Sequence, residues 1–189
     1  TGIRMGNIPI TIGPSTIFDG APQNTLYPGV KAIASGAVVN GVMAAAAITI
    51  APQLVSAVSV KSHGTAGSLS LPIDTNAEIA GPLTVEPRLG TTHTLVFTFN
   101  GPVTALGYTA APNVTSKDAA GVDVGTVDSV VLDSMTNTVT VTLSGIANTK
   151  RTRVTLNNIN QLGVDVPVVI GFLVGDADSN GKVDATDAA

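Results

Sequence analysis

The stretch Thr94-Leu95-Val96-Phe97-Thr98-Phe99 shows most clearly which fold this chain adopts. Leu95, Phe97 and Phe99 recur at every second position, which is the period of a β-strand with one face in a core. Val96 can face a second buried layer, and Asn100-Gly101-Pro102 ends the strand. Thr138-Val139-Thr140-Val141-Thr142-Leu143 has the same alternation. We expect it to form a hairpin with residues 127–132, around a turn at residues 133–137.

Similar short segments occur before and after these strands and are separated by Gly, Pro, Asn and Asp. They predict further strands at residues 54–61, 68–71, 151–156 and 164–173. Helical periodicity is nearly absent. The sequence therefore predicts an all-β protein, an immunoglobulin-like β-sandwich with an N-terminal extension. We expect three parts: residues 1–52 as an apolar segment that is an assembly arm or a small β-subdomain, residues 53–173 as the sandwich, and residues 174–189 as a calcium-binding loop.

The N-terminal part is harder to interpret. Turn signals stand at Gly13-Pro14, Asp19-Gly20, Ala21-Pro22 and Pro28-Gly29. Residues 8–12 alternate like a short strand, and Pro9 suggests a sheet edge or a strand start. The alanine run in residues 44–50 favours a helix, whereas Ile48, Thr49 and Ile50 favour a strand.

Residues 32–60 contain no charged side chain, which raises the question of a membrane span. Asn40, Gly41 and Pro52 interrupt this segment, and much of it is alanine. We therefore expect a buried strand pair or a subunit contact here, and no membrane span.

The composition limits the function classes. Hydrophobic residues make up 44% of the 189-residue chain and charged residues only 12%, about half the usual charged share. A surface so poor in charge favours a homo-oligomer or polymer that hides part of it. The nine Lys and Arg residues are scattered and the net charge is −4, so we expect no nucleic-acid partner. The absence of cysteine excludes disulfides and thiolate metal sites. The first residue is Thr1, which indicates a processed chain or a fragment.

The C-terminal segment Asp176-Ala177-Asp178-Ser179-Asn180-Gly181-Lys182-Val183-Asp184-Ala185-Thr186-Asp187 has the spacing of a calcium loop of the EF-hand type. Counted from Asp176, oxygen-bearing side chains fall at positions one, three, five, nine and twelve, which suits the many oxygen ligands of Ca²⁺. Gly181 allows the sharp turn at position six, and we expect Val183 to pin the loop to the core. The predicted metal ligands are Asp176, Asp178, Asn180, Lys182 through its backbone carbonyl, Asp184 and Asp187. The alternative is a solvated acidic tail with a glycine turn.

Residues 174–187 resemble the first half of a type I dockerin repeat, with the pattern Gly-Asp-x-Asn/Asp-x-x-Gly-x-Val-Asn/Asp-x-x-Asp. Residues 60–67, 94–99, 139–146 and 155–158 look like a β-sandwich module that precedes such loops in exported bacterial surface proteins. The resemblance implies an extracellular or cell-surface location and a cohesin-like protein as a partner. A dockerin has two loops, each followed by a helix, and neither a second loop nor a helix follows Asp187.

No motif predicts catalysis, so we do not expect an enzyme. His63 and His93 have no nearby acidic residue in the sequence and are expected to be structural or exposed. Glu78 and Glu86 could act as a glycosidase pair, but eight residues apart in a Pro/Gly-rich segment they more often decorate a loop.

Two other groups of residues are candidate binding sites. Asp118, Asp123 and Asp128 are solvated loop carboxylates or a second, weaker calcium site. Phe97, Phe99 and Phe172 are expected in the core. That leaves Tyr27 and Tyr108 for stacking on sugars, which disfavours carbohydrate binding.

Two functions follow from these observations. The first is an extracellular, calcium-stabilised structural protein that assembles with copies of itself, for example as a filament or surface-layer subunit. The alternative is a dockerin-bearing binding module that anchors a larger exported protein to a cohesin-like partner.

Overall fold

The computed structural model describes residues 3–62, 64–178 and 180–188, and this part of the chain is all-β. It contains three sheets, and its helical segments are single 3₁₀ turns: η1 Gln23–Thr25, η2 Gly64–Ala66, η3 Ile159–Gln161 and η4 Ala185–Ala188. The prediction of an all-β fold is therefore confirmed. None of the helical segments in the described residues is long and apolar enough to cross a membrane.

Two of the sheets share one core and are consistent with a β-sandwich. The five-stranded sheet has the order β10-β11-β8-β5-β6, with bounds β5 Leu54–Ser62, β6 Ser68–Ile73, β8 Thr92–Phe99, β10 Thr126–Asp133 and β11 Thr138–Ser144. The four-stranded sheet has the order β7-β13-β12-β9, with bounds β7 Val85–Glu86, β9 Val114–Lys117, β12 Lys150–Leu156 and β13 Val166–Phe172. Buried residues from both sheets form a single hydrophobic cluster.

The register of the larger sheet follows from the alternation in the sequence. Phe97 on β8 lies between Val139 on β11 and Ala57 on β5. All three side chains are at most 2% exposed. β10 and β11 form the antiparallel hairpin that the sequence predicts. Residues with period two therefore end up in adjacent rows of one core face, where burial of apolar area stabilises the sheet.

The N-terminal residues form a third sheet with a core of its own. Its order is β1-β2-β4-β3, with bounds β1 Ile3–Met5, β2 Ile8–Asp19, β3 Ala32–Val39 and β4 Val42–Ile50. Ile10, Ile48 and Ile50 are at most 5% exposed and form the centre of this core. The alanine run is therefore a strand, because its β-branched isoleucines pack into a sheet interior.

Pro9 is the second residue of β2, so of the two alternatives that it suggested the strand start is confirmed. The edge is wrong, because β2 is an interior strand that pairs with both β1 and β4. It also continues past Gly13-Pro14, with a register shift between Ile12 and Ile17 instead of a turn. The Thr16 hydroxyl bridges this irregularity: its Oγ1 accepts from the Gly13 N–H at 3.0 Å and donates to the Ala45 carbonyl at 2.7 Å.

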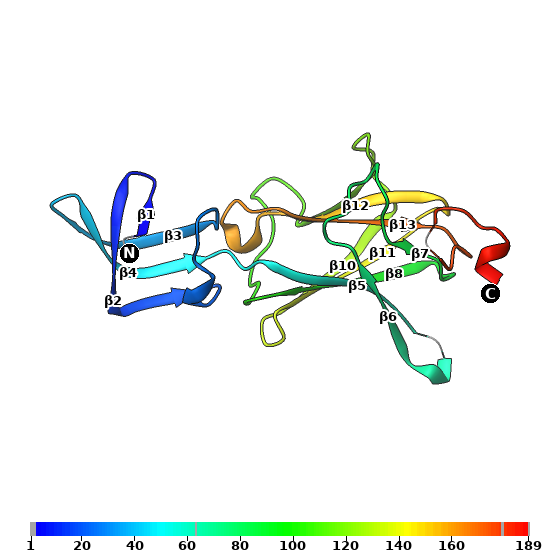
Figure 1. Cartoon of the computed structure of the whole chain (residues 1–189), viewed down its shortest axis with the longest axis horizontal. Helices are drawn as coiled ribbons and strands as arrows, with labels where there is room; N and C mark the ends of the chain where they lie inside the picture. Colours follow the sequence, from blue (N-terminus) through cyan, green and yellow to red (C-terminus); the bar gives the residue numbers. More distant parts are fainter. Residues whose placement is uncertain (1–2, 63, 179, 189) are drawn as a thin grey trace.

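The N-terminal sheet and the C-terminal loop lie at opposite ends of the long axis of the molecule (Figure 1). The N-terminal sheet meets the sandwich through close backbone contacts. A Cβ atom placed on Gly101 would lie 2.0 Å from the Gly20 carbonyl oxygen, so only glycine fits there. Beside it, the Gln53 N–H donates to the Asn100 side-chain oxygen at 2.8 Å, and the Asn100 N–H donates to the Gln53 carbonyl at 3.0 Å.

Candidate metal site and a buried polar cluster

The predicted calcium loop begins directly after β13 and is tied to the sandwich at its first residues. The Gly175 N–H donates to the Pro87 carbonyl at 3.0 Å, and the Asp176 N–H donates to the Leu173 carbonyl at 3.2 Å. The Val174 N–H donates to the side-chain oxygen of Asn148 at 2.9 Å. The first bond holds the start of the loop against the segment that follows β7, and the third ties it to the connection between β11 and β12.

Three of the predicted ligands come together in the structure. Carboxylate oxygens of Asp176, Asp178 and Asp187 all lie within 4.8 Å of one another. Asp176 is fully buried, Asp187 is partly buried and Asp178 is exposed. Such a group of oxygens, contributed by the start and the end of one short loop, can hold a metal ion.

Hydrogen bonds close the loop around this group. The Asp176 carboxylate accepts from the N–H groups of Asn180 at 3.0 Å and Gly181 at 2.9 Å. The Asp187 carboxylate accepts from the N–H groups of Ala177 at 2.7 Å and Asp184 at 2.8 Å. Gly181 has a φ of +82°, which matches the sharp turn expected at position six.

The other predicted ligands do not belong to the cluster of three carboxylates. The Asn180 side-chain oxygen accepts from the Lys182 N–H at 2.8 Å, and its amide donates to Asp178 at 2.9 Å. The Asp184 carboxylate accepts from the backbone and hydroxyl of Thr186 at 2.9 Å and 2.8 Å. The Lys182 side chain is exposed, as expected for a residue that would offer only its carbonyl.

The expectation that Val183 pins the loop to the core is wrong. Its side chain is 56% exposed. It lies close to Gly175 and on the rim of a groove of about 300 Å³, lined in part by Phe172 and Leu173. The loop extends beyond the last residue of β13, and Val183 packs against the rim of the sandwich instead of its interior.

The cluster is strongly negative. Among the described residues, no lysine or arginine forms an ion pair with Asp176, Asp178 or Asp187. A hydrogen bond from the Thr186 hydroxyl is the main reason that the pKa of Asp178 is held below its usual value, with further hydrogen bonds from Asn180. Close, uncompensated carboxylates repel one another, and a bound cation removes this repulsion.

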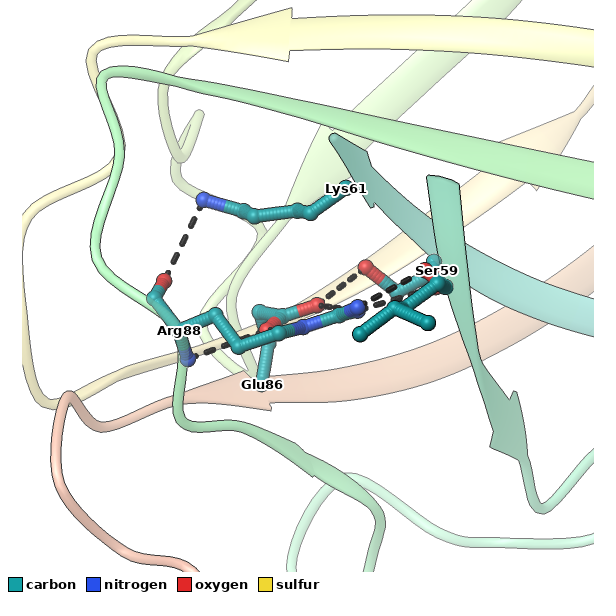
Figure 2. Close-up of polar contacts among 5 residues, drawn as sticks. Ser59, Lys61, Glu86 and Arg88 are labelled. Atoms are coloured by element: carbon teal, nitrogen blue, oxygen red, sulfur yellow. Dashed lines mark hydrogen bonds and ion pairs between the residues drawn. The ribbon is translucent and has the colours of Figure 1, made fainter. Parts of the chain in front are cut away.

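A second polar cluster lies inside the sandwich, next to the loop (Figure 2). Glu86, the last residue of β7, is 1% exposed. Its two oxygens accept from the Arg88 guanidinium, with Nε–Oε1 and Nη2–Oε2 distances of 2.6 Å, and the Ser59 hydroxyl donates to the same carboxylate. Arg88 also donates to the carbonyls of Leu69 at 2.8 Å and Ser59 at 2.9 Å. Lys61 donates to the Arg88 carbonyl at 3.2 Å.

The interpretation of Glu86 as a loop decoration is therefore wrong. Arg88 follows two residues later and turns back over the carboxylate as a bidentate partner. Burial alone would raise the pKa of Glu86, but the hydrogen bonds from Arg88 and Ser59 outweigh it and hold that pKa below its usual value. Glu78 is exposed on the surface. The Glu86-Pro87-Arg88 spacing is the signal that sequence reasoning missed.

His93 on β8 borders the same cluster. It is 5% exposed, its Nδ1 has no hydrogen-bond partner, and its ring packs edge-on against Phe172 with a centroid distance of 4.4 Å. The pKa of His93 is lowered to about 4, mainly by burial. The positive charge of Lys61 also lowers this pKa, the negative charge of Glu86 raises it, and the charge of Arg88 lowers it by a smaller amount. His63 lies outside the described residues.

The structure does not gather Asp118, Asp123 and Asp128 into one group. Asp118 accepts from the N–H groups of Ala120 and Val122, both at 2.9 Å. Asp123 pairs with Lys117 at 2.7 Å, and Asp128 accepts from the Ser144 hydroxyl at 2.8 Å. These contacts are typical of solvated carboxylates, which is the first of the two interpretations given for Asp118, Asp123 and Asp128.

Comparison with known proteins found no match: no family model, no curated protein sequence and no solved structure is significantly similar to this chain.

Proposed function

We propose that this chain is an extracellular structural protein whose C-terminal loop binds Ca²⁺ and which associates with copies of itself. The observation that carries the calcium part is the cluster of Asp176, Asp178 and Asp187, whose carboxylate oxygens lie within 4.8 Å of one another. A buried carboxylate without a cationic partner is costly, and Asp176 is fully buried without one. A bound cation would explain why this carboxylate is buried.

The donor set favours calcium among the common cations. It consists of carboxylates on a flexible loop, without His or Cys, and this combination suits hard cations rather than zinc or copper. Ca²⁺ accepts irregular arrangements of oxygens at 2.3–2.6 Å, whereas Mg²⁺ requires a nearly ideal octahedron. The remaining predicted ligands, Asn180, Asp184 and the Lys182 carbonyl, lie on the same loop and would complete the shell after small rearrangements.

The resemblance of residues 174–187 to a type I dockerin repeat and the low charge of the chain support an exported bacterial surface protein with an immunoglobulin-like sandwich. Extracellular calcium modules bind with Kd values of about 10⁻⁴–10⁻³ M, which suits a loop that includes only a few carboxylates. We place no catalytic step in this protein, because both oxygens of its buried glutamate are engaged by Arg88 and Ser59.

Calorimetric titration with CaCl₂ and with MgCl₂, together with thermal unfolding in Ca²⁺ and in EDTA, tests the calcium part of the proposal. At a free Ca²⁺ concentration 100 times the Kd, linkage stabilises the fold by about 2.7 kcal/mol. This corresponds to a rise in Tm of roughly 5–10 °C for a chain of this length.

Asp176→Asn is the informative variant, because it keeps the shape of the side chain and removes the buried charge. We expect it to abolish the calcium-dependent rise in Tm. Asp128→Asn is the matched control, since Asp128 is exposed and an amide oxygen can still accept from Ser144. Absence of calcium binding in the unmodified protein, or equal binding by Asp176→Asn, would refute the site.

A further inference from the structure

The N-terminal sheet has one face that none of the described residues covers. Residues that are paired across β2, β4 and β3 have their side chains on the same face of the sheet. The pairing register therefore shows on which of the two faces each side chain lies. Ile48 and Ile50 face the side that is covered by Ala21, Leu26 and Val30 of the segment between β2 and β3. The opposite side, here called the outer face, carries the apolar residues Ile17, Ile33, Ala37, Val39, Val42, Ala44 and Ala47, and between them Thr11, Ser35 and Thr49.

The outer face is mainly apolar and open to solvent. Ile17 is 66% exposed, Ile33 52%, Val39 66% and Val42 39%. On β3 and β4, Val39 and Val42 at one end and Ile33 at the other flank two central pairs of small residues, Ala37–Ala44 and Ser35–Ala47. Single exposed apolar residues are ordinary, but a contiguous group on one sheet face marks an interaction surface.

The charged residues within the four strands of this sheet are Arg4 on β1 and Asp19 on β2. Both belong to the outer face: Arg4 pairs with Pro9, and Asp19 pairs with Thr49, which also pairs with Ile33. Both are exposed. They stand at opposite ends of β2, so the face is positive at one end and negative at the other.

We propose that two copies of this chain stack through their outer faces about a two-fold axis that runs across the strands, midway between the Ala37–Ala44 pair and the Ser35–Ala47 pair. This axis lays each strand antiparallel over its own copy. Ile33 then lies over Val39 of the second copy. At the centre Ala37 lies over Ser35 and Ala44 over Ala47, and these small side chains let the sheets approach closely. Arg4 of each copy comes over the end of the other copy that carries Asp19, so the symmetry creates two opposite-charge pairs.

The area of the face sets the strength of this contact. β3 has eight residues, so at about 3.3 Å per residue and 4.8 Å between strands the three long strands cover about 400 Å². A stable interface buries about 800 Å² per partner. The outer face therefore supports a reversible pair that depends on protein concentration. Such a pair gives the self-association of the proposed function a defined surface, and it requires no calcium.

Sedimentation velocity over a wide range of protein concentrations, in Ca²⁺ and in EDTA, tests the pairing. We expect a monomer–dimer equilibrium for the unmodified protein. Val39→Asp places a charge in the apolar contact and should weaken dimerisation by roughly tenfold or more. Val131→Asp is the control, because Val131 is also an exposed strand valine, at 57%, on a different sheet. It should leave the equilibrium unchanged.

Charge reversal tests the two-fold geometry itself. Arg4→Asp and Asp19→Lys should each weaken the dimer, and the two substitutions together should restore it, which a misfolded sheet would not do. A monomer at every concentration, a dimer that tolerates Val39→Asp, or a double variant that stays monomeric would overturn the inference. Thermal unfolding of Val39→Asp with and without Ca²⁺ separates the two proposals. If this variant is monomeric but its Tm still rises with Ca²⁺, the metal site is intact and only the contact between copies is lost.

Discussion

The buried His93 makes the stability of this protein depend on pH in a range where few other groups titrate. Its pKa is lowered to about 4 in the folded chain, whereas an unfolded histidine titrates near 6.5. The unfolded state therefore takes up the proton first as the pH falls. The stabilisation is fully present above pH 6.5 and is lost between pH 6.5 and pH 4. Between pH 8 and pH 5 the loss is about 2 kcal/mol.

The assay is urea unfolding at several pH values in EDTA, so that proton release from a metal-bound loop does not contribute. The unmodified protein is compared with His93→Phe, which retains a ring against Phe172, and with His93→Gln. Both variants should lose most of the slope of the unfolding free energy between pH 8 and pH 5, whatever their absolute stability. The pKa of Glu86 is lowered below 4.5, so the stabilisation that its carboxylate contributes is lost mainly at pH values below this range. An unchanged slope in both variants would show that His93 is not the group responsible.

Two further substitutions test the contacts described above. Glu86→Gln removes the charge that neutralises Arg88 inside the sandwich and should cost about 3 kcal/mol in urea unfolding at pH 7; a loss below about 1 kcal/mol would mean that the pair is solvated. Gly101→Ala puts a methyl group 2.0 Å from the Gly20 carbonyl and should loosen the joint between the N-terminal sheet and the sandwich. Limited proteolysis should then cut near residues 20 and 53 faster than in a Gly81→Ala control, where a Cβ would meet its nearest neighbour at an ordinary 3.6 Å, and equal rates would contradict the close contact.

The strands that the sequence predicts best are those with one buried face. β8 and β11 alternate strictly because Leu95, Phe97, Val139 and Val141 all point into one core, and each is fully buried. β9 and β7 were missed, since four and two residues are too short to show a period. β7 is defined only by its pairing with β13, a long-range contact that local sequence does not encode.

The candidate metal loop was predictable because its chemistry lies within twelve consecutive residues. Spacing alone places Asp176, Gly181 and Asp187 at the first, turning and last positions of the loop. The Glu86 cluster was predictable only in part: Arg88 stands two residues from Glu86 in the sequence, but Ser59 and Lys61 reach the cluster from β5. Sequence reasoning considers the residues near Glu86 in the chain, whereas its environment is set by the packing of two sheets.

The two clusters meet at one end of the sandwich, and this explains why a buried ion pair is placed there. The Leu173 N–H donates to the Glu86 carbonyl at 3.3 Å and the Gly175 N–H to the Pro87 carbonyl at 3.0 Å, so the short strand β7 holds the chain from which the acidic loop departs. Repulsion among the three loop carboxylates pulls on this junction when no cation is bound. The bidentate Arg88 contact fixes β7 from the side of the core and resists that pull. We therefore expect the core to hold Asp176 in a similar place with and without an ion, so that less of the binding free energy is spent on ordering the loop.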